Sequence, residues 1–130
     1  TAREGIKGVL FWGRRKQAEM PAYFNASDVM IVSLCDQPVL ALTVPAKFQA
    51  CLAFSKPVFA VMNGEVRRVV EEYRTGLYAR PDSSEAIRDG FRRFYELRGK
   101  GLEDFSANSK VLLDTVYNRG RIIDGLTGLL

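Results

Sequence analysis

The chain has 130 residues, of which 47% are hydrophobic and 26% are charged, and a net charge of +4, which fits a single domain over residues 1–130. It contains no histidine, and Cys35 and Cys51 lack CxxC spacing, so we expect neither a metal site nor another cofactor. The scattered arginines argue against nucleic acid as a partner, and no apolar run reaches the roughly 20 residues that span a bilayer.

Strand and helix patterns alternate from the start of the chain. Val9–Trp12 is a short apolar run that predicts a strand. Glu19–Ala26 predicts a short helix with Pro21 near its beginning, where proline is tolerated. Asp28–Leu34 is almost continuously apolar and rich in β-branched side chains, so it predicts a strand covered on both faces.

The middle of the chain continues the alternation. Lys47–Phe54 predicts a helix, and Pro57–Met62 predicts a second buried strand. Glu65–Tyr73 carries apolar side chains at positions i, i+3, i+4 and i+7, which is typical of an amphipathic helix. Gly76 is expected to end that helix in the left-handed conformation, and Leu77–Ala79 predicts a short strand at a sheet edge.

The last third of the chain is predicted to be helical. Asp82 and Glu85 are spaced like a capping box at the start of a helix. Its buried stripe is expected to consist of four apolar side chains, namely Ile87, Phe91, Phe94 and Tyr95. From Leu102 onward a further helical pattern is interrupted near 118–120. The alternating order predicts an α/β fold, a Rossmann-like parallel sheet with helices on both faces and a helical C-terminal tail.

Three segments are candidates for a ligand site, because ligands of open parallel sheets bind outside the carboxyl ends of the strands. The first is Gly13-Arg14-Arg15, whose arginines clamp an anion or are ordinary surface arginines. The second is Cys35–Ala46, a long loop of the kind that is often functional. The third is Asn63-Gly64-Glu65, in which Asn63 and Gly64 signal a turn and Glu65 favours the start of the following helix.

Thr43, Val44, Pro45, Ala46 and Lys47 form the entrance to the helix that follows the long loop. A capping hydroxyl at Thr43 and a pre-set φ at Pro45 suit this position. A helix N-terminus presents free N–H groups and a positive dipole end, which suit a phosphate, and Lys47 adds a positive charge. The alternative is that Thr43 only caps the helix and Lys47 is solvated.

At these same segments the sequence resembles the C-terminal domain of GT-B glycosyltransferases of family 4. The similar runs are VLFWGRRKQAEMPAYFNASDVMIVSL, LTVPAKFQACLAFSKPVFAVMNGEVRRVVEEYRTGLYARPDS and, in the tail, EDFSANSKVLLDTVYNR. They resemble the family's strand-Gly-Arg, "eelp.yy..AD", "PSK…GKPV", "GE…i.e…G" and "p.D" succession and its closing "nFs" helix. Together they cover nearly the whole chain, and their order and spacing are specific.

The resemblance implies a domain that holds a nucleotide-sugar, often a UDP-sugar, without a metal. It implies that Gly13 and Arg14 lie near the base and that Thr43 to Lys47 lie beside the diphosphate, with Gly64 and Glu65 in the "GE" motif. Many relatives carry two glutamates with seven residues between them, whereas this chain has Leu42 and Ala50 there. It is closer to a subgroup with "T.PSK" that is associated with bacterial surface polysaccharide assembly.

The resemblance also implies that the chain is the donor-binding half of a two-domain retaining enzyme, preceded by a further strand and an acceptor-binding N-terminal domain, and inactive alone. We expect a cytoplasmic protein. Peripheral membrane contact would use four basic side chains on one helix face, namely Arg88, Arg92, Arg93 and Arg98. The simpler explanation of these arginines is that they form an ordinary solvated helix face.

A rival hypothesis is a non-catalytic α/β interaction domain that keeps the fold but not donor binding. A receiver-type signalling domain is disfavoured, because the chain lacks the acidic cluster at strand ends that holds its metal.

Overall fold

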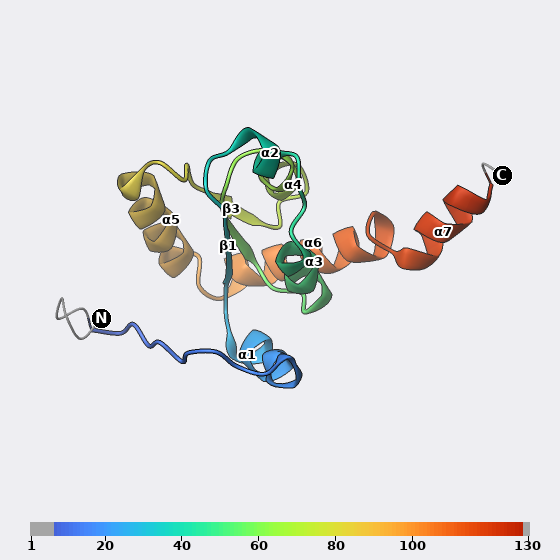
Figure 1. The fold of residues 1–130 in the computed structure, drawn as a ribbon. Helices are drawn as coiled ribbons and strands as arrows, with labels where there is room; N and C mark the ends of the chain where they lie inside the picture. The colour runs from blue at the N-terminus through green and yellow to red at the C-terminus, as the bar shows by residue number, and fades with distance from the viewer. Residues whose placement is uncertain (1–6, 129–130) are drawn as a thin grey trace.

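The computed structural model describes residues 7–128, which contain one three-stranded parallel sheet in the order β1-β2-β3 (Figure 1). The strands are β1 (Met30–Ser33), β2 (Val58–Val61) and β3 (Gly76–Tyr78). The helices are η1 (Gln17–Glu19), α1 (Met20–Ala26), α2 (Pro38–Ala41), α3 (Ala46–Ala53), α4 (Glu65–Glu72), α5 (Ser84–Glu96), α6 (Lys100–Thr115) and α7 (Arg119–Thr127). In the register of the sheet, Met30 lies opposite Val58, which lies opposite Gly76. The predicted α/β Rossmann-like fold with a helical C-terminal tail is confirmed.

One face of the sheet is covered by α3 and α4, which connect the strands. Val66, Val69 and Val70 of α4 are buried, as their helical spacing predicts. Phe48 and Leu52 of α3 are fully buried in the same core. All four residues of β2 are buried, because β2 is the central strand of the described sheet and has helices over both faces.

The opposite face is covered by α5 and the first turns of α6. Phe59 of β2 is fully buried at the centre of this layer. Its ring makes edge-to-face contacts with Phe91 and Phe94 of α5, at centroid distances of 5.2 and 5.4 Å. Such aromatic pairs stabilise a core beyond the area that they bury, so α5 is fixed to the sheet mainly through Phe59.

The prediction of a strand over Val9–Trp12 is wrong. Its side chains are 49–77% exposed, and the segment 7–16 is extended on the side of the sheet where α1 lies (Figure 1). A short apolar run becomes a strand only where a neighbouring strand completes its backbone hydrogen bonds. No strand of the described residues pairs with this segment. Trp12 instead contacts Tyr23 of α1, with ring centroids 6.1 Å apart.

The strand predicted over Asp28–Leu34 is confirmed as β1, but not its cover on both faces. Val32 is 1% exposed on the face of α3. Ile31 is only half-buried on the other face, and Ser33 is exposed. Within residues 7–128 β1 pairs with β2 alone, so β1 is an edge strand of the described sheet. Its position at the edge accounts for the incomplete burial of Ile31 and Ser33.

Gly76 does not end α4 as predicted. It is the first residue of β3, and the left-handed residue after α4 is Arg74, with a φ of 52°. Glycine is still needed at position 76, because a Cβ atom there would lie 1.7 Å from the carbonyl oxygen of Val58. The sequence thus indicates that the glycine at position 76 is important. The reason, which only the structure shows, is the close approach of the β3 backbone to the β2 backbone.

The predicted start and buried stripe of α5 are corrected at three positions. The helix is capped by Ser83, whose Oγ accepts a backbone N–H of the first turn at 3.1 Å, whereas Asp82 pairs with an arginine. Phe94 is buried, but Phe91 is 51% exposed and Tyr95 is 68% exposed. Phe91 and Tyr95 line an open groove between the end of α5 and the start of β1, so this part of the apolar stripe is left uncovered.

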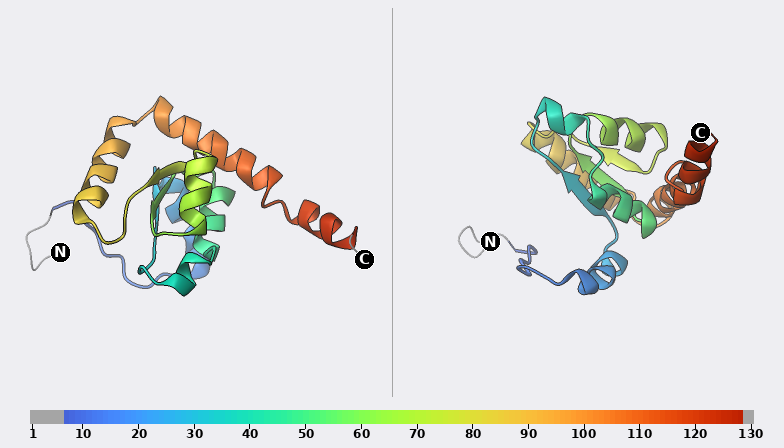
Figure 2. Two further views of the ribbon diagram at one scale, coloured as in Figure 1. Left: turned by 90° about the horizontal axis from the view of Figure 1, so that it is seen from above. Right: turned by 45° about the vertical axis from the view of Figure 1, so that its right-hand side comes forward.

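The helical tail and its predicted break are confirmed. Asn118 separates α6 from α7 and caps α7 by accepting a backbone N–H at 3.1 Å. Leu112 of α6 is fully buried, and the Ser109 hydroxyl donates to the carbonyl oxygen of Lys56 at 3.2 Å. α7 buries no residue and projects away from the sheet (Figure 1, Figure 2). In the described part of the chain, no helix has the length and apolar character needed to cross a membrane.

Candidate functional site

The carboxyl ends of the three strands open onto one edge of the sheet, which we call the carboxyl edge. It consists of residues 34–47 after β1, 62–65 after β2 and 79–83 after β3. In Figure 1, α2 and the start of α4 lie at this end of the sheet, and α1 lies at the opposite end. Since α3, α4 and α5 all follow these loops, the positive ends of their dipoles lie at the carboxyl edge.

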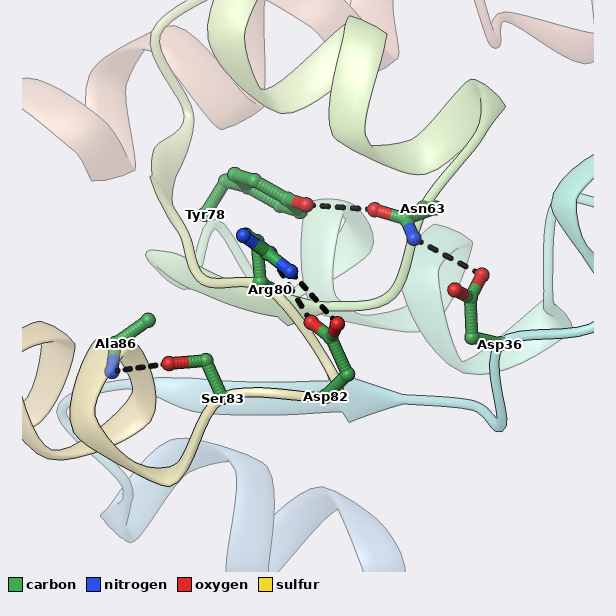
Figure 3. A network of polar contacts seen from close by, with 7 residues as sticks. All are labelled: Asp36, Asn63, Tyr78, Arg80, Asp82, Ser83 and Ala86. Atoms are coloured by element: carbon green, nitrogen blue, oxygen red, sulfur yellow. Dashed lines mark hydrogen bonds and ion pairs between the residues drawn. The ribbon is translucent and has the colours of Figure 1, made fainter.

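A chain of hydrogen bonds joins the three strand ends (Figure 3). The hydroxyl of Tyr78, the last residue of β3, donates to Oδ1 of Asn63 at 2.6 Å. Nδ2 of Asn63 donates to Oδ1 of Asp36 at 2.9 Å. Tyr78 and Asn63 are half-buried, whereas Asp36 is exposed. The network therefore fixes the three loops relative to one another and holds a carboxylate at the surface.

Two arginines lie beside this network. Arg80 donates from Nε and Nη2 to the carboxylate of Asp82, at 3.1 and 2.7 Å (Figure 3). These hydrogen bonds raise the pKa of Arg80 and lower the pKa of Asp82. The Arg67 guanidinium lies over the ring of Tyr78, with Cζ 4.3 Å from the ring centroid. The carboxyl edge thus combines positive side chains with two exposed carboxylates, of which Asp82 is paired with Arg80.

Gly64 brings the α2 turn against the start of α4. Its φ is +90°, and a Cβ atom there would lie 1.9 Å from the carbonyl oxygen of Ala41. Only glycine tolerates both the dihedral angle and the close approach. Ala41 is the last residue of α2, two residues before Thr43. The contact therefore brings together two of the predicted segments, Cys35–Ala46 and Asn63-Gly64-Glu65.

Thr43 does not cap the helix that follows it, contrary to the prediction. Its hydroxyl donates to the carbonyl oxygen of Leu40 at 2.8 Å, inside the turn that ends α2. α3 begins at Ala46, with Pro45 in the N-cap position and no side-chain cap. The short helix α2 was not predicted. The Thr43 hydroxyl is bound to a carbonyl group of α2, so it does not cap α3.

The other predicted residues of these two segments differ in their surroundings. Val44 is half-buried against the core, and Lys47 is exposed in the first turn of α3. The Glu65 carboxylate accepts from Nη2 and Nε of Arg68, at 2.6 and 3.0 Å. This ion pair holds the pKa of Glu65 below its usual value. Lys47 is therefore directed to solvent at the carboxyl edge, whereas Glu65 is engaged on the surface of its own helix.

Gly13 and Arg14 are not brought to the carboxyl edge. Since Val9–Trp12 is not a strand, Gly13-Arg14-Arg15 follows no strand end, and its segment runs on the side of α1 (Figure 1). Gly13 has a φ of +66° and no neighbouring atom within 4 Å of an added Cβ. Arg14 is exposed, and Arg15 lies over Trp12, with Cζ 5.6 Å from the ring centroid. The role of Gly13 and Arg14 in ligand binding stays a prediction.

Residues 7–128 also form an apolar groove away from the carboxyl edge. It has a volume of about 500 Å³ and lies between the start of β1 and the end of α5, lined by Val29, Ile31, Phe91, Tyr95 and others. These residues belong to the opposite end of the sheet from the carboxyl edge. Within residues 7–128, no three His, Cys, Asp or Glu side chains are grouped so that they would hold a metal ion.

Sequence reasoning did not single out three residues at or beside the carboxyl edge, namely Asp36, Tyr78 and Arg80. It also interpreted Asn63 only as a turn residue, although Asn63 is the centre of the network. One feature of the sequence could have identified all four residues. Each is a polar side chain at the end of a strand or within three residues after it. Side-chain pairing across strands depends on strand order and register, which the local pattern does not contain.

Comparison with known proteins gives one match. A sequence model of the family described as "Glycosyl transferases group 1" matches residues 1–96. No curated protein and no solved structure matches the chain. The matched region includes all three strands, α2, α3, α4 and every residue of the carboxyl edge. The chain therefore belongs to the group 1 glycosyl transferase family.

Proposed function

We propose that this chain binds a nucleoside diphosphate sugar, in particular a UDP-sugar, as the donor-binding domain of a retaining glycosyltransferase. The observation that carries the proposal is the family match, whose residues contain the whole carboxyl edge. Family membership supports sugar transfer as the reaction class. The rule that ligands bind outside the carboxyl ends of parallel strands supports this edge as the place of the donor.

The diphosphate of the donor needs hydrogen-bond donors and positive charge. α3 begins at the carboxyl edge, and Lys47 is exposed in its first turn. Backbone N–H groups at a helix N-terminus and a nearby ammonium group suit a phosphate. We therefore assign Thr43, Val44, Pro45, Ala46 and Lys47 to the diphosphate. Gly64 and Glu65 flank it, and Gly13 and Arg14 would reach the base once their segment docks on the sheet.

The transfer itself breaks the bond between the anomeric carbon and a diphosphate oxygen. A bond forms between that carbon and a hydroxyl oxygen of the acceptor, the proton of that hydroxyl passes to the leaving diphosphate, and the nucleoside diphosphate leaves. Negative charge grows on the leaving diphosphate, and fixed positive groups around it stabilise the transition state. The proposed acceptor is a glycan or a lipid-linked glycan in surface polysaccharide biosynthesis.

We further propose that residues 1–130 are one domain of a larger enzyme whose acceptor-binding domain belongs to the same polypeptide. The edge of β1 supports this arrangement, because β1 pairs on one side only within residues 7–128 and the sheet can continue there. The proposed location is cytoplasmic, at the inner face of a membrane. The exposed arginines of α5 are the proposed peripheral contact with anionic lipid.

The apolar groove favours a second candidate, a non-catalytic interaction domain. Phe91 and Tyr95 are 51% and 68% exposed and line this groove, and exposed apolar surface of this kind is typical of protein contacts. The two candidates differ at the carboxyl edge, since only a donor-binding domain responds there to a nucleotide.

Titration of the ¹⁵N-labelled protein with UDP and UDP-glucose tests the proposal. We expect amide signals of Thr43, Ala46, Lys47 and Gly64 to shift with saturation. Lys47→Met should weaken UDP binding about 3- to 10-fold, which is the loss of one favourable charge of up to about 1.4 kcal/mol. Lys110→Met, at an exposed lysine of α6, is the matched control and should leave the affinity unchanged.

Two results would contradict the proposal. One is the absence of any shift at the carboxyl edge with a large excess of UDP, which would leave the interaction domain as the better hypothesis. The other is equal weakening by Lys47→Met and Lys110→Met, which would indicate attraction by overall charge rather than a site at α3.

A further inference from the structure

The polarity of the network at the carboxyl edge follows from its one carboxylate. A carboxylate only accepts hydrogen bonds, so the side-chain amide of Asn63 must turn Nδ2 toward Asp36. Oδ1 of Asn63 then faces Tyr78, and the Tyr78 hydroxyl must donate to it. The direction of every hydrogen bond in the network is therefore fixed, and it ends at Asp36.

The network is also held in place at its other end. The Tyr78 ring is half-buried in β3, and Arg67 covers one face of it at 4.3 Å. The Asn63 side chain is half-buried between Tyr78 and Asp36. Rotation of the Asp36 carboxylate would break its bond with Asn63, so residues at the ends of the other two strands set the orientation of this exposed group.

Asp36 keeps free capacity to accept hydrogen bonds. A carboxylate has two oxygens with about four acceptor positions. Among residues 7–128, only Asn63 donates a hydrogen bond to Asp36, through Oδ1. The neighbouring carboxylate of Asp82 differs, because both of its oxygens accept from Arg80. Asp36 is thus the carboxylate in Figure 3 that is oriented by the protein and still open to a ligand.

The chemistry of this group selects the part of a donor that it can meet. An oriented carboxylate attracts hydroxyl donors and repels phosphate oxygens. A carboxylate at the carboxyl edge of a Rossmann-like sheet can take a pair of sugar hydroxyls with its two oxygens. We propose that Asp36, held by Asn63 and Tyr78, accepts hydrogen bonds from vicinal hydroxyl groups of the nucleotide-sugar.

This inference rests on the proposed nucleotide-sugar binding and adds a specificity-determining residue to it. Asp36 marks the hydroxyl side of the site, and Lys47 in the first turn of α3 marks the phosphate side. Asn63 and Tyr78 are positioning residues, because they act on the ligand only through Asp36. The vicinal hydroxyls belong either to the ribose or to the transferred sugar, and both share the same chemistry.

The test compares ligands that differ in hydroxyl groups on the wild-type protein and on Asp36→Asn. The asparagine keeps an oxygen that accepts from Asn63 but loses the charge and one acceptor oxygen, so the fold should be undisturbed. The probes are UDP, 2′-deoxy-UDP, 3′-deoxy-UDP and a panel of UDP-hexoses, with dissociation constants from isothermal titration calorimetry. If the ribose is bound, UDP should bind about 10- to 100-fold more tightly than a deoxy analogue, the range for a hydrogen bond to a charged group.

In Asp36→Asn that preference should fall severalfold, because the hydroxyl no longer meets a charged acceptor. If the transferred sugar is bound instead, the preference for a UDP-hexose over UDP should fall in the same way, while the deoxy analogues bind like UDP. Tyr78→Phe should reduce the same preference partially and leave the affinity for the deoxy analogue unchanged. This selective loss distinguishes positioning from a general loss of structure.

Asp89→Asn is the matched control, because Asp89 is an exposed aspartate of α5 that pairs with Arg88 away from the network. It should leave every preference unchanged. The inference about Asp36 is overturned if Asp36→Asn retains the wild-type preferences, or if the wild-type protein binds UDP without any hydroxyl preference. A wild-type protein that binds none of these nucleotides overturns the proposed function itself, and this inference with it.

Discussion

Gly64 and Gly99 provide a matched pair for measuring how tightly the α2 turn packs at the carboxyl edge. Both are N-cap residues, of α4 and α6, and their φ and ψ angles are 90° and −143° and 87° and −127°. A Cβ atom at Gly64 would lie 1.9 Å from the carbonyl oxygen of Ala41, whereas a Cβ atom at Gly99 would meet nothing within 4 Å. Alanine therefore suffers similar backbone strain at both positions and a collision only at position 64.

The two costs are of similar size. Strain alone should lower the free energy of unfolding by about 1–3 kcal/mol in Gly99→Ala. The collision with Ala41 should add a further cost of about 1–3 kcal/mol in Gly64→Ala, as overpacking does elsewhere. The combined loss is a large part of the about 5–15 kcal/mol that stabilises a typical domain.

Urea unfolding followed by far-ultraviolet circular dichroism measures both losses. Trp12 fluorescence is less suitable, because Trp12 is 57% exposed and lies in the segment before α1. Gly125→Ala in α7 is the control, since an added Cβ meets no atom within 4 Å there, and it should not lower the stability. Equal losses in Gly64→Ala and Gly99→Ala, within about 0.5 kcal/mol, would refute the close packing of the α2 turn.

Three further predictions concern the core and one ion pair. Phe59→Ala should lower the free energy of unfolding by about 3–5 kcal/mol in urea, because Phe59 is fully buried among the aromatic rings of α5. Burial raises the pKa of the Cys51 thiol from 9.0 to about 11. The free energy of unfolding should therefore not depend on ionisation of this thiol below pH 9.0. As the pH rises from 9.0 toward 11, that free energy should fall by up to about 1.4 kcal/mol per pH unit, because only the unfolded chain ionises the thiol there. In Arg68→Gln the pKa of the Glu65 carboxyl should rise toward its ordinary value of 4.5 in an NMR titration, because the hydrogen bonds from Arg68 are lost.

Each of these predictions has its own control. Phe91→Ala, at a ring that is 51% exposed, should cost clearly less than Phe59→Ala, and equal costs would contradict the role of Phe59 as the central contact. Cys51→Ala should show a smaller loss of stability with rising pH, and an unchanged slope would show that the thiol does not ionise on unfolding. Arg67→Gln should leave the pKa of Glu65 unchanged, because Arg67 pairs with Glu71.

Local pattern was sufficient for most elements of this fold. The i, i+3, i+4 spacing in Glu65–Tyr73 predicted α4 because burial of one helix face follows directly from periodicity. The continuous apolar run Pro57–Met62 predicted β2 because a central strand is covered on both faces. The same reasoning failed for Val9–Trp12, since an apolar run is a strand only when a neighbouring strand pairs with it.

The candidate site divides in the same way. The sequence by itself determined that loops at the carboxyl ends of parallel strands are the place for a ligand, and it singled out the loop of Asp36 and the glycine at position 64. Only the tertiary structure decided which side chains meet there, because the bonds from Tyr78 to Asn63 and from Asn63 to Asp36 join residues 15 and 27 positions apart along the chain. Hydrogen bonds between strand ends depend on the order and register of the strands, which are set by packing and are not written in any one segment.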